Sequence, residues 1–258
     1  MNEKELQTAL KHLHLGGLRY FEQVGSTNDI ALAWADEKSI ADYSLVLANE
    51  QISGRGRNGR KWQTPADTAL ALSLILLPNS DEKKNLILFT ALGALALVTA
   101  LKKSYALPAE IKWPNDVLIG GKKVAGILVE ANWLGNQPKA IVLGMGINIS
   151  AKAVPPDDEM RIPATSLEDA LDKPVRRLDV LAGLLRALIE WRPHLGGDEM
   201  VAAWDGHLAY KGQQVEIRGR TGQVIQGKVL GINKDGSLRL DTAPSIHFGD
   251  VHLRPSRV

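Results

Sequence analysis

The residues with the clearest chemical potential lie in one short segment, residues 54–62 (GRGRNGRKW). Its nine residues include four basic side chains, three glycines and one tryptophan, and no acid. Cations this close repel one another, whereas glycine lets the backbone turn tightly and approach a ligand. Arginine offers planar paired donors that suit phosphate and carboxylate. The segment therefore predicts an anion-binding loop, with a solvated basic loop as the alternative.

The same segment matches G-x-G-x-x-G, but its context argues against a dinucleotide-binding fold. That motif must follow a strand and open a helix within a βαβ unit. A predicted strand at 44–50 precedes the loop, but a second buried strand, 68–77, follows it without a crossover helix. A G-x-x-x-x-G-K-[ST] phosphate loop does not occur in the sequence.

A second polar cluster is the segment 112–116 (KWPND). Its proline fixes the backbone and disfavours helix for the residue before it, so a strand must end or bend there. This brings Lys112, Asn115 and Asp116 to one rim, which is either a functional edge or a solvated turn.

Two strands carry further candidates. Lys123 enters an apolar strand, where it either faces an anion or merely flanks a hairpin turn. Gly126 removes a side chain in mid-strand, which often marks close approach of a ligand. The segment 144–148 (GMGIN) ends the next strand, and its two glycines and Asn148 fit either a nucleotide contact or a bulge. The six histidines show no metal-ligand spacing, so no protein-bound metal is predicted.

Composition bounds the remaining possibilities. The chain has 258 residues, a net charge of +2 and no cysteine, which excludes disulfides, thiol catalysis and thiolate zinc sites and suits a reducing cytosol. The charge is too small for bulk nucleic-acid binding. The first residues are charged, unlike a signal peptide, and the apolar run 86–101 reads as a core helix. We therefore expect a cytoplasmic protein with no membrane segment.

The predicted strands and helices that must position these residues do not follow one another as repeated βαβ units. Glycine turns between apolar runs favour antiparallel hairpins, so the fold class is α+β, with a mixed, mainly antiparallel sheet. We expect a first domain at 1–208 and a small five-stranded barrel at 209–258. The predicted helices are 3–13, 26–37, 83–104, 166–171, 177–191 and 198–205, and 151–163 is loop-like. The predicted strands are 18–24, 44–50, 68–77, 110–113, 117–119, 123–133, 140–149, 214–218, 223–232, 237–241, 245–248 and 251–253.

Taken together, the motifs make the sequence similar to the biotin protein ligases, also called biotin–[acetyl-CoA carboxylase] ligases. Five motifs stand in that family's order and approximate spacing and cover about residues 25–150. They are Ser26–Asn28, Gln51 with 54–62, 112–116, 123–130 and 144–148. The resemblance implies a catalytic fold like that of class II aminoacyl-tRNA synthetases, followed by an SH3-like C-terminal domain.

The resemblance also implies an activity and the residues that perform it. Biotin and Mg-ATP give biotinyl-5′-AMP and pyrophosphate, and the acyl group then passes to a lysine of a biotin carboxyl carrier domain. The residues matching catalytic positions are Lys123, Arg55, Arg57 and Asp116. Those matching biotin-binding positions are Ser26, Thr27, Asn28, Gln51, Gly54, Arg55, Lys123, Gly126 and Leu128, with Trp113 expected beside Leu128 in an apolar wall. Those matching nucleotide-binding positions are Arg57, Arg60, Trp62, Lys112, Asn115 and Asn148.

The sequence departs from the family pattern at two positions. Many relatives have a basic residue where this chain has Asn58, and an acid where it has Gly25.

Two other functions remain open. The nearest rival function is a lipoate–protein ligase, and a rival of a different class is a non-catalytic biotin- or nucleotide-sensing module. Some family members carry an N-terminal DNA-binding module, and only some 17 residues precede the first predicted strand, so we expect no DNA binding. Relatives differ in oligomeric state, which leaves a homodimer through a sheet edge open.

Overall fold

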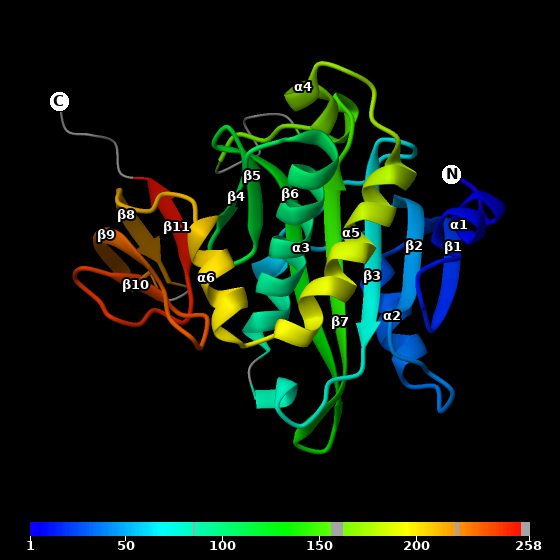
Figure 1. The fold of residues 1–258 in the computed structure, drawn as a ribbon, viewed down its shortest axis with the longest axis horizontal. Helices are drawn as coiled ribbons and strands as arrows, with labels where there is room; N and C mark the ends of the chain where they lie inside the picture. Colours follow the sequence, from blue (N-terminus) through cyan, green and yellow to red (C-terminus); the bar gives the residue numbers. More distant parts are fainter. Residues whose placement is uncertain (85, 156–161, 220–221, 254–258) are drawn as a thin grey trace.

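The centre of the molecule is a seven-stranded sheet with the strand order β1-β2-β3-β7-β6-β5-β4 (Figure 1). The computed structural model describes residues 1–84, 86–155, 162–219 and 222–253. Strands β1 and β2 are parallel, and the other neighbouring strands are antiparallel. This confirms the predicted α+β class. The strands are β1 (Gly17–Val24), β2 (Ser44–Gln51), β3 (Ala69–Leu76), β4 (Ala109–Lys112), β5 (Asp116–Ile119), β6 (Lys122–Leu134) and β7 (Gln137–Asn148).

Helices cover both faces of this sheet. On one face α3 packs beside α5, and both bury leucines against the strands in the main core (Figure 1). On the other face α2 lies close to the sheet because Ala31 and Ala35 meet Val46, Ile75 and Val142. The helices are α1 (Glu3–Leu10), α2 (Thr27–Ala35), α3 (Ile87–Tyr105), α4 (Leu167–Leu171), α5 (Arg177–Trp191) and α6 (Asp198–Gly206). Short 3-10 turns are η1 (Arg57–Gly59), η2 (Glu82–Lys84), η3 (Ala151–Ala153) and η5 (Arg192–His194).

The long helix α3 is the core helix that the apolar run 86–101 predicted. By length and composition it is the one helix of the described chain that could cross a membrane, but 72 % of its apolar window is buried inside the fold. It begins at Ile87, because residues 82–84 form the separate turn η2. Of the predicted loop 151–163, residues 151–153 form η3, and residues 156–161 lie outside the described chain.

The C-terminal strands form a second, four-stranded antiparallel sheet in the order β10-β9-β8-β11. Five strands were expected, but the stretch 245–248 makes only an isolated bridge between Ile246 and Leu238 in the described chain. Pro244 has no N–H to donate to a ladder, and Gly249 has a φ of 128°, so regular pairing fails on both sides. The strands are β8 (Gln214–Arg218), β9 (Val224–Ile232), β10 (Leu238–Leu240) and β11 (Asp250–Leu253).

The edge strand β4 joins the two sheets. Ile111 donates to the carbonyl of His207 at 2.7 Å and accepts from Ala209 at 3.0 Å, so the chain after α6 extends this edge. One residue beyond β4, the fully buried indole of Trp113 donates its Nε1–H to the carbonyl of Gly236 at 2.9 Å. Trp113 therefore anchors the C-terminal sheet to the seven-stranded sheet.

Trp113 tests this anchor. Trp113→Ala should lower the free energy of unfolding by about 3–5 kcal/mol, because it opens a large cavity in the core. Trp113→Phe fills most of that space but leaves the Gly236 carbonyl without its donor, so it should cost less, about 1 kcal/mol from the hydrogen bond plus a smaller packing loss. Urea unfolding of both variants measures the difference. Equal stability of Trp113→Ala and the unsubstituted protein would contradict this role.

Candidate functional site

A cavity of about 420 Å³ opens on the sheet face that α2 covers, away from α3 and α5. Side chains alternate between the faces of a strand. On β7, Leu143 and Met145 therefore point into the main core, whereas Gly144 and Gly146 face the cavity. The loop 54–62 and the N-terminal turn of α2 cover the cavity on the side facing away from the sheet.

Nearly all the candidate residues from the sequence line this one cavity. Gly54 lies outside the lining, at the base of the loop, where its carbonyl accepts from the Trp62 N–H at 2.9 Å. The candidates in the lining are Ser26, Thr27, Asn28, Gln51, Arg55, Arg57, Arg60, Trp62, Lys112, Asn115, Asp116, Lys123, Gly126, Leu128 and Asn148.

The glycines of β6 and β7 make room for other side chains of the site. A Cβ on Gly144 would lie 2.1 Å from Oδ1 of Asn28, and one on Gly146 would lie 2.2 Å from the indole of Trp62. Gly126 is less tightly covered, since its Cβ would lie 3.1 Å from the same indole, a contact that a shift of a few tenths of an ångström would relieve. Gly126 pairs with Gly146 in regular register, so the bulge considered for 144–148 is not present there.

The loop 54–62 folds back on itself and is tied to four separate segments of the chain. Its backbone closes through the N–H of Gly56, which donates to the carbonyl of Arg60 at 2.7 Å. Arg55 binds carboxylates on α2 and β6. Arg57 donates to Oδ1 of Asn115 at 3.0 Å, and Arg60 forms an ion pair with Asp250 of β11. Three arginines therefore hold the loop over the cavity.

The floor of the cavity carries a buried cluster of two lysines and one carboxylate. Asp116 Oδ1 lies 2.6 Å from Nζ of Lys123, and Oδ2 lies 3.6 Å from Nζ of Lys112. Burial alone would raise the pKa of Asp116, but the positive charges of Lys123 and Lys112 outweigh it and hold that pKa below its usual range. Burial lowers the pKa of Lys112, although Asp116 opposes the shift. Asp116 is therefore a stable anion beside two cations.

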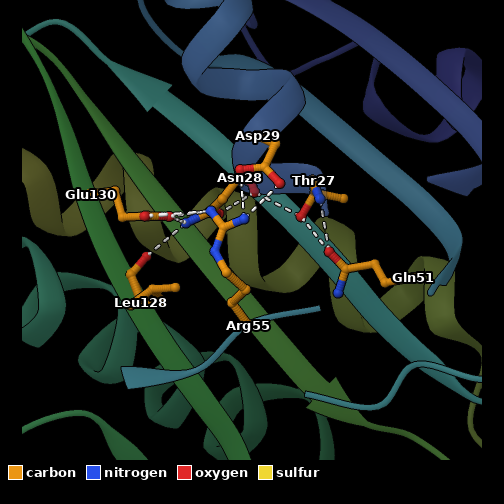
Figure 2. Close-up of polar contacts among 8 residues, drawn as sticks. Thr27, Asn28, Asp29, Gln51, Arg55, Leu128 and Glu130 are labelled. Atoms are coloured by element: carbon orange, nitrogen blue, oxygen red, sulfur yellow. Dashed lines mark hydrogen bonds and ion pairs between the residues drawn. The ribbon is translucent and has the colours of Figure 1, made fainter. Parts of the chain in front are cut away.

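The opposite side of the cavity presents hydroxyl and amide groups (Figure 2). The side-chain oxygen of Gln51 accepts from the backbone N–H of Thr27 at 2.8 Å and from its hydroxyl at 3.0 Å. Asn28 accepts from Ser73 at 2.6 Å and donates to Glu130, also at 2.6 Å. Ser26 is buried, and within the described chain its hydroxyl makes no capping bond to α2. These groups could bind a small polar ring.

The structure adds residues that sequence reasoning missed. Asp250 and His252 of β11 line the cavity from the C-terminal sheet, and no spacing in the sequence signals this. Glu130 was part of a motif without an assigned role, although it alternates with Gly126 and Leu128 and so shares their face of β6. Trp113 is a correction: it was expected in the apolar wall, but it is absent from the cavity lining and bonds Gly236.

A metal site built from protein side chains alone is not present in the part of the chain that the structure describes. No group of three or more His, Cys, Asp or Glu side chains there could hold an ion. The two cavity carboxylates, Asp116 and Asp250, each pair with basic side chains.

The sequence of the chain matches two protein-family models and several characterised relatives. Residues 20–148 match the model of the biotin/lipoate A/B protein ligase family, and residues 211–254 match that of the biotin protein ligase C-terminal domain. The chain is 31 % identical to the bifunctional ligase/repressor BirA of Bacillus subtilis, over 98 % of this chain and 79 % of that protein. It is 35 % identical to a biotin–[acetyl-CoA-carboxylase] ligase of Paracoccus denitrificans, over 83 % of this chain and 90 % of the relative.

A solved structure agrees with these sequence matches. The biotin protein ligase of Aquifex aeolicus in complex with biotin and ATP superposes with a TM-score of 0.78 at 28 % identity, covering 93 % of this chain and 99 % of the other. The likeness extends across both sheets.

Proposed function

The chain belongs to the biotin protein ligase family, and we propose that the cavity under the loop 54–62 is where it joins biotin to ATP. As a biotin–[acetyl-CoA-carboxylase] ligase it forms biotinyl-5′-AMP and then transfers biotin to a lysine. The observation that carries the assignment of the site is the convergence of Arg57, Lys112 and Lys123, from three segments, on one cavity.

In the first step two anions must meet. A carboxylate oxygen of biotin attacks the α-phosphorus of ATP, a P–O bond forms, and the bond to pyrophosphate breaks. Lys123 and Arg57 reduce the repulsion between the carboxylate and the phosphates and stabilise the charge that develops on the α-phosphate. Lys112 and Arg60 add positive charge along the nucleotide. Preorganised charges in a partly closed site are effective because water does not have to reorganise around them.

Biotin lies with its ureido ring among the amides and hydroxyls. That ring has two N–H donors and one carbonyl acceptor. Ser26, Thr27 and Gln51 supply hydroxyl and amide groups of both kinds, and Asn28 holds the N-terminal turn of α2 in place. Gly126 and Leu128 form the wall for the apolar tail, and Gly54 lets the loop approach β2.

The nucleotide takes the other half of the cavity. Trp62 supplies a flat surface for the adenosine, and its buried Nε1–H makes no hydrogen bond within the described residues, so it is available to a ligand acceptor. Asn115 and Asn148 flank it. Mg²⁺ enters on the phosphates of ATP, as is usual for this ion, and supplies further charge neutralisation there.

In the second step the neutral amine of the carrier lysine attacks the carbonyl carbon of biotinyl-5′-AMP; a C–N bond forms, the C–O bond to AMP breaks, AMP leaves, and the amine proton passes to solvent. The low pKa of Asp116 makes it a weak base, so we assign it to positioning the incoming amine by charge rather than to removing its proton. The carrier is the biotin carboxyl carrier domain of acetyl-CoA carboxylase or a related carboxylase. We further propose cytoplasmic action and domains at 1–208 and 209–258. Sedimentation decides between a monomer and a homodimer through the exposed sheet edge.

A carrier-labelling assay tests the function. The protein is incubated with labelled biotin or labelled lipoate, ATP, Mg²⁺ and a carrier domain. We expect acid-stable label on the carrier with biotin only. Label from lipoate alone would indicate the related ligase activity, and binding of biotin without transfer would indicate a sensing module; either result would overturn the assignment.

The low pKa of Lys112 predicts how ATP binding depends on pH. A lysine with a lowered pKa loses its proton at a lower pH than an ordinary lysine, so a cation disappears from the site as the pH rises. The Kd for ATP, measured by calorimetry from pH 7 to pH 10, should therefore rise at the alkaline end. Lys112→Met should bind ATP more weakly than the unsubstituted protein at pH 7, lack the alkaline rise, and approach the affinity of the unsubstituted protein at the alkaline end. An unchanged alkaline rise in Lys112→Met would assign it to another group.

A further inference from the structure

Arg55 differs from the other cations of the site because two carboxylates already hold it (Figure 2). Its Nη1 lies 2.6 Å from each carboxylate oxygen of Asp29, and its Nη2 lies 3.2 Å from Oε2 of Glu130. The hydrogen bonds to Asp29 raise the pKa of Arg55, with Glu130 adding to the effect against some burial. We call Arg55, Asp29 and Glu130 the Arg55 clamp.

The clamp is part of the framework that holds the biotin side of the cavity. Oε2 of Glu130 receives both Arg55 and, at 2.6 Å, the side-chain amide of Asn28. Asn28 in turn accepts from the buried hydroxyl of Ser73 on β3 at 2.6 Å. One carboxylate thus connects the loop 54–62, the N-terminal turn of α2 and the sheet.

We propose that Asp29 and Glu130 are positioning residues that hold the loop 54–62 closed through Arg55, so that they retain biotin and its adenylate without touching either. This rests on the proposed function of the cavity. Asp29 is absent from the cavity lining, and so is Glu130. On this view Arg55 serves the reaction by fixing the loop, whereas Arg57 and Lys123 contact the anions.

The family resemblance implied a different role for Arg55, direct binding of biotin, and the two roles predict changes of opposite sign in the Kd for biotin when the acids are neutralised. If Arg55 bound the substrate directly, Asp29 and Glu130 would compete for its guanidinium, and neutralising them would strengthen biotin binding. If the clamp holds the loop, neutralising them loosens the loop and weakens binding. The sign of the change therefore decides between the roles.

The experiment uses Asp29→Asn and Glu130→Gln in the full chain. Both keep the side-chain shape, and glutamine still offers an oxygen to Asn28. We expect each variant to raise the Kd for biotin, measured by calorimetry, and to speed tryptic cleavage within 54–62. Each should also speed the release of biotinyl-5′-AMP by roughly 5-fold, a modest factor because the ion pairs are partly exposed. The matched control is Glu37→Gln, which breaks the Arg19–Glu37 pair, of similar exposure, just beyond the C-terminal end of α2 and should change none of the three quantities.

A double-mutant cycle shows whether the acids act through Arg55. In an Arg55→Gln background, Asp29→Asn should add no further loss, because the clamp is already open. Tighter biotin binding by Asp29→Asn or Glu130→Gln would overturn the proposal, and so would an undiminished effect in the Arg55→Gln background or no effect at all. An inactive unsubstituted protein would instead count against the function itself, so the two failures are distinguishable.

Discussion

Replacing Lys123 with alanine should slow the formation of biotinyl-5′-AMP by about 10²–10³-fold, the usual cost of removing one preorganised charge from a transition state. The reason is geometric: Nζ of Lys123 faces the cavity from β6, 5.4 Å from the ring of Trp62 and beside Asp116. In the proposed complex, its loss leaves the α-phosphate without the cation nearest the attacking carboxylate. Biotin-dependent exchange of labelled pyrophosphate into ATP measures this step without the carrier.

The neighbouring residue provides the control for this variant. Lys122 has the same charge but lies exposed at the turn between β5 and β6, and it is not part of the cavity lining. Lys122→Ala should leave pyrophosphate exchange within about 2-fold of the unsubstituted protein, since exposed charges contribute little. Exchange within a few-fold of normal in Lys123→Ala would contradict the role of this lysine.

Gly146→Ala should lower kcat/KM for ATP by about 100-fold, although it adds only one methyl group. The new Cβ would lie 2.2 Å from the indole of Trp62, a rigid ring that cannot yield by a small rotation. Trp62 must therefore leave its place against β7. In the proposed complex the adenosine then loses the flat surface of Trp62, and the loop 54–62 loses its contact with β7. Steady-state kinetics with ATP as the varied substrate measure the loss.

A glycine in α5 separates this effect from a general intolerance of alanine. A Cβ on Gly183 would meet its nearest neighbours at 3.6 Å, an ordinary contact, and alanine favours a helix over glycine. Gly183→Ala should therefore keep full activity and gain a few tenths to about 1 kcal/mol of stability. Normal ATP kinetics in Gly146→Ala would show that Trp62 does not serve the nucleotide.

The sequence was sufficient for the fold class and for which segments gather at the site, because both depend on local patterns. Alternating apolar runs with glycine turns indicated antiparallel strands, and clustered cations indicated an anion site. The alternation of side chains along a strand also predicts the orientation of Trp113, which was wrongly expected in the cavity wall. Lys112 faces the cavity, so its neighbour Trp113 had to point away, and the structure places it against Gly236.

What the sequence could not predict depends on pairing between distant elements. Asp250 reaches Arg60 across 190 residues only because β11 pairs with β8 and returns to the cavity. The prediction of a strand at 245–248 was wrong because Gly249 adopts a backbone conformation that interrupts the ladder of hydrogen bonds. The glycines of 144–148 could be explained only once Asn28 and Trp62 were seen lying on them.

A crystal structure of the protein with a hydrolysis-resistant analogue of biotinyl-5′-AMP tests the central claim most directly. We predict that the ligand occupies the cavity under the loop 54–62, with Nζ of Lys123 and the guanidinium of Arg57 at about 3 Å from its phosphate oxygens or acyl carbonyl. The ureido ring should face Thr27 and Gln51. A ligand bound elsewhere, or bound here with both cations turned away from it, would contradict the account.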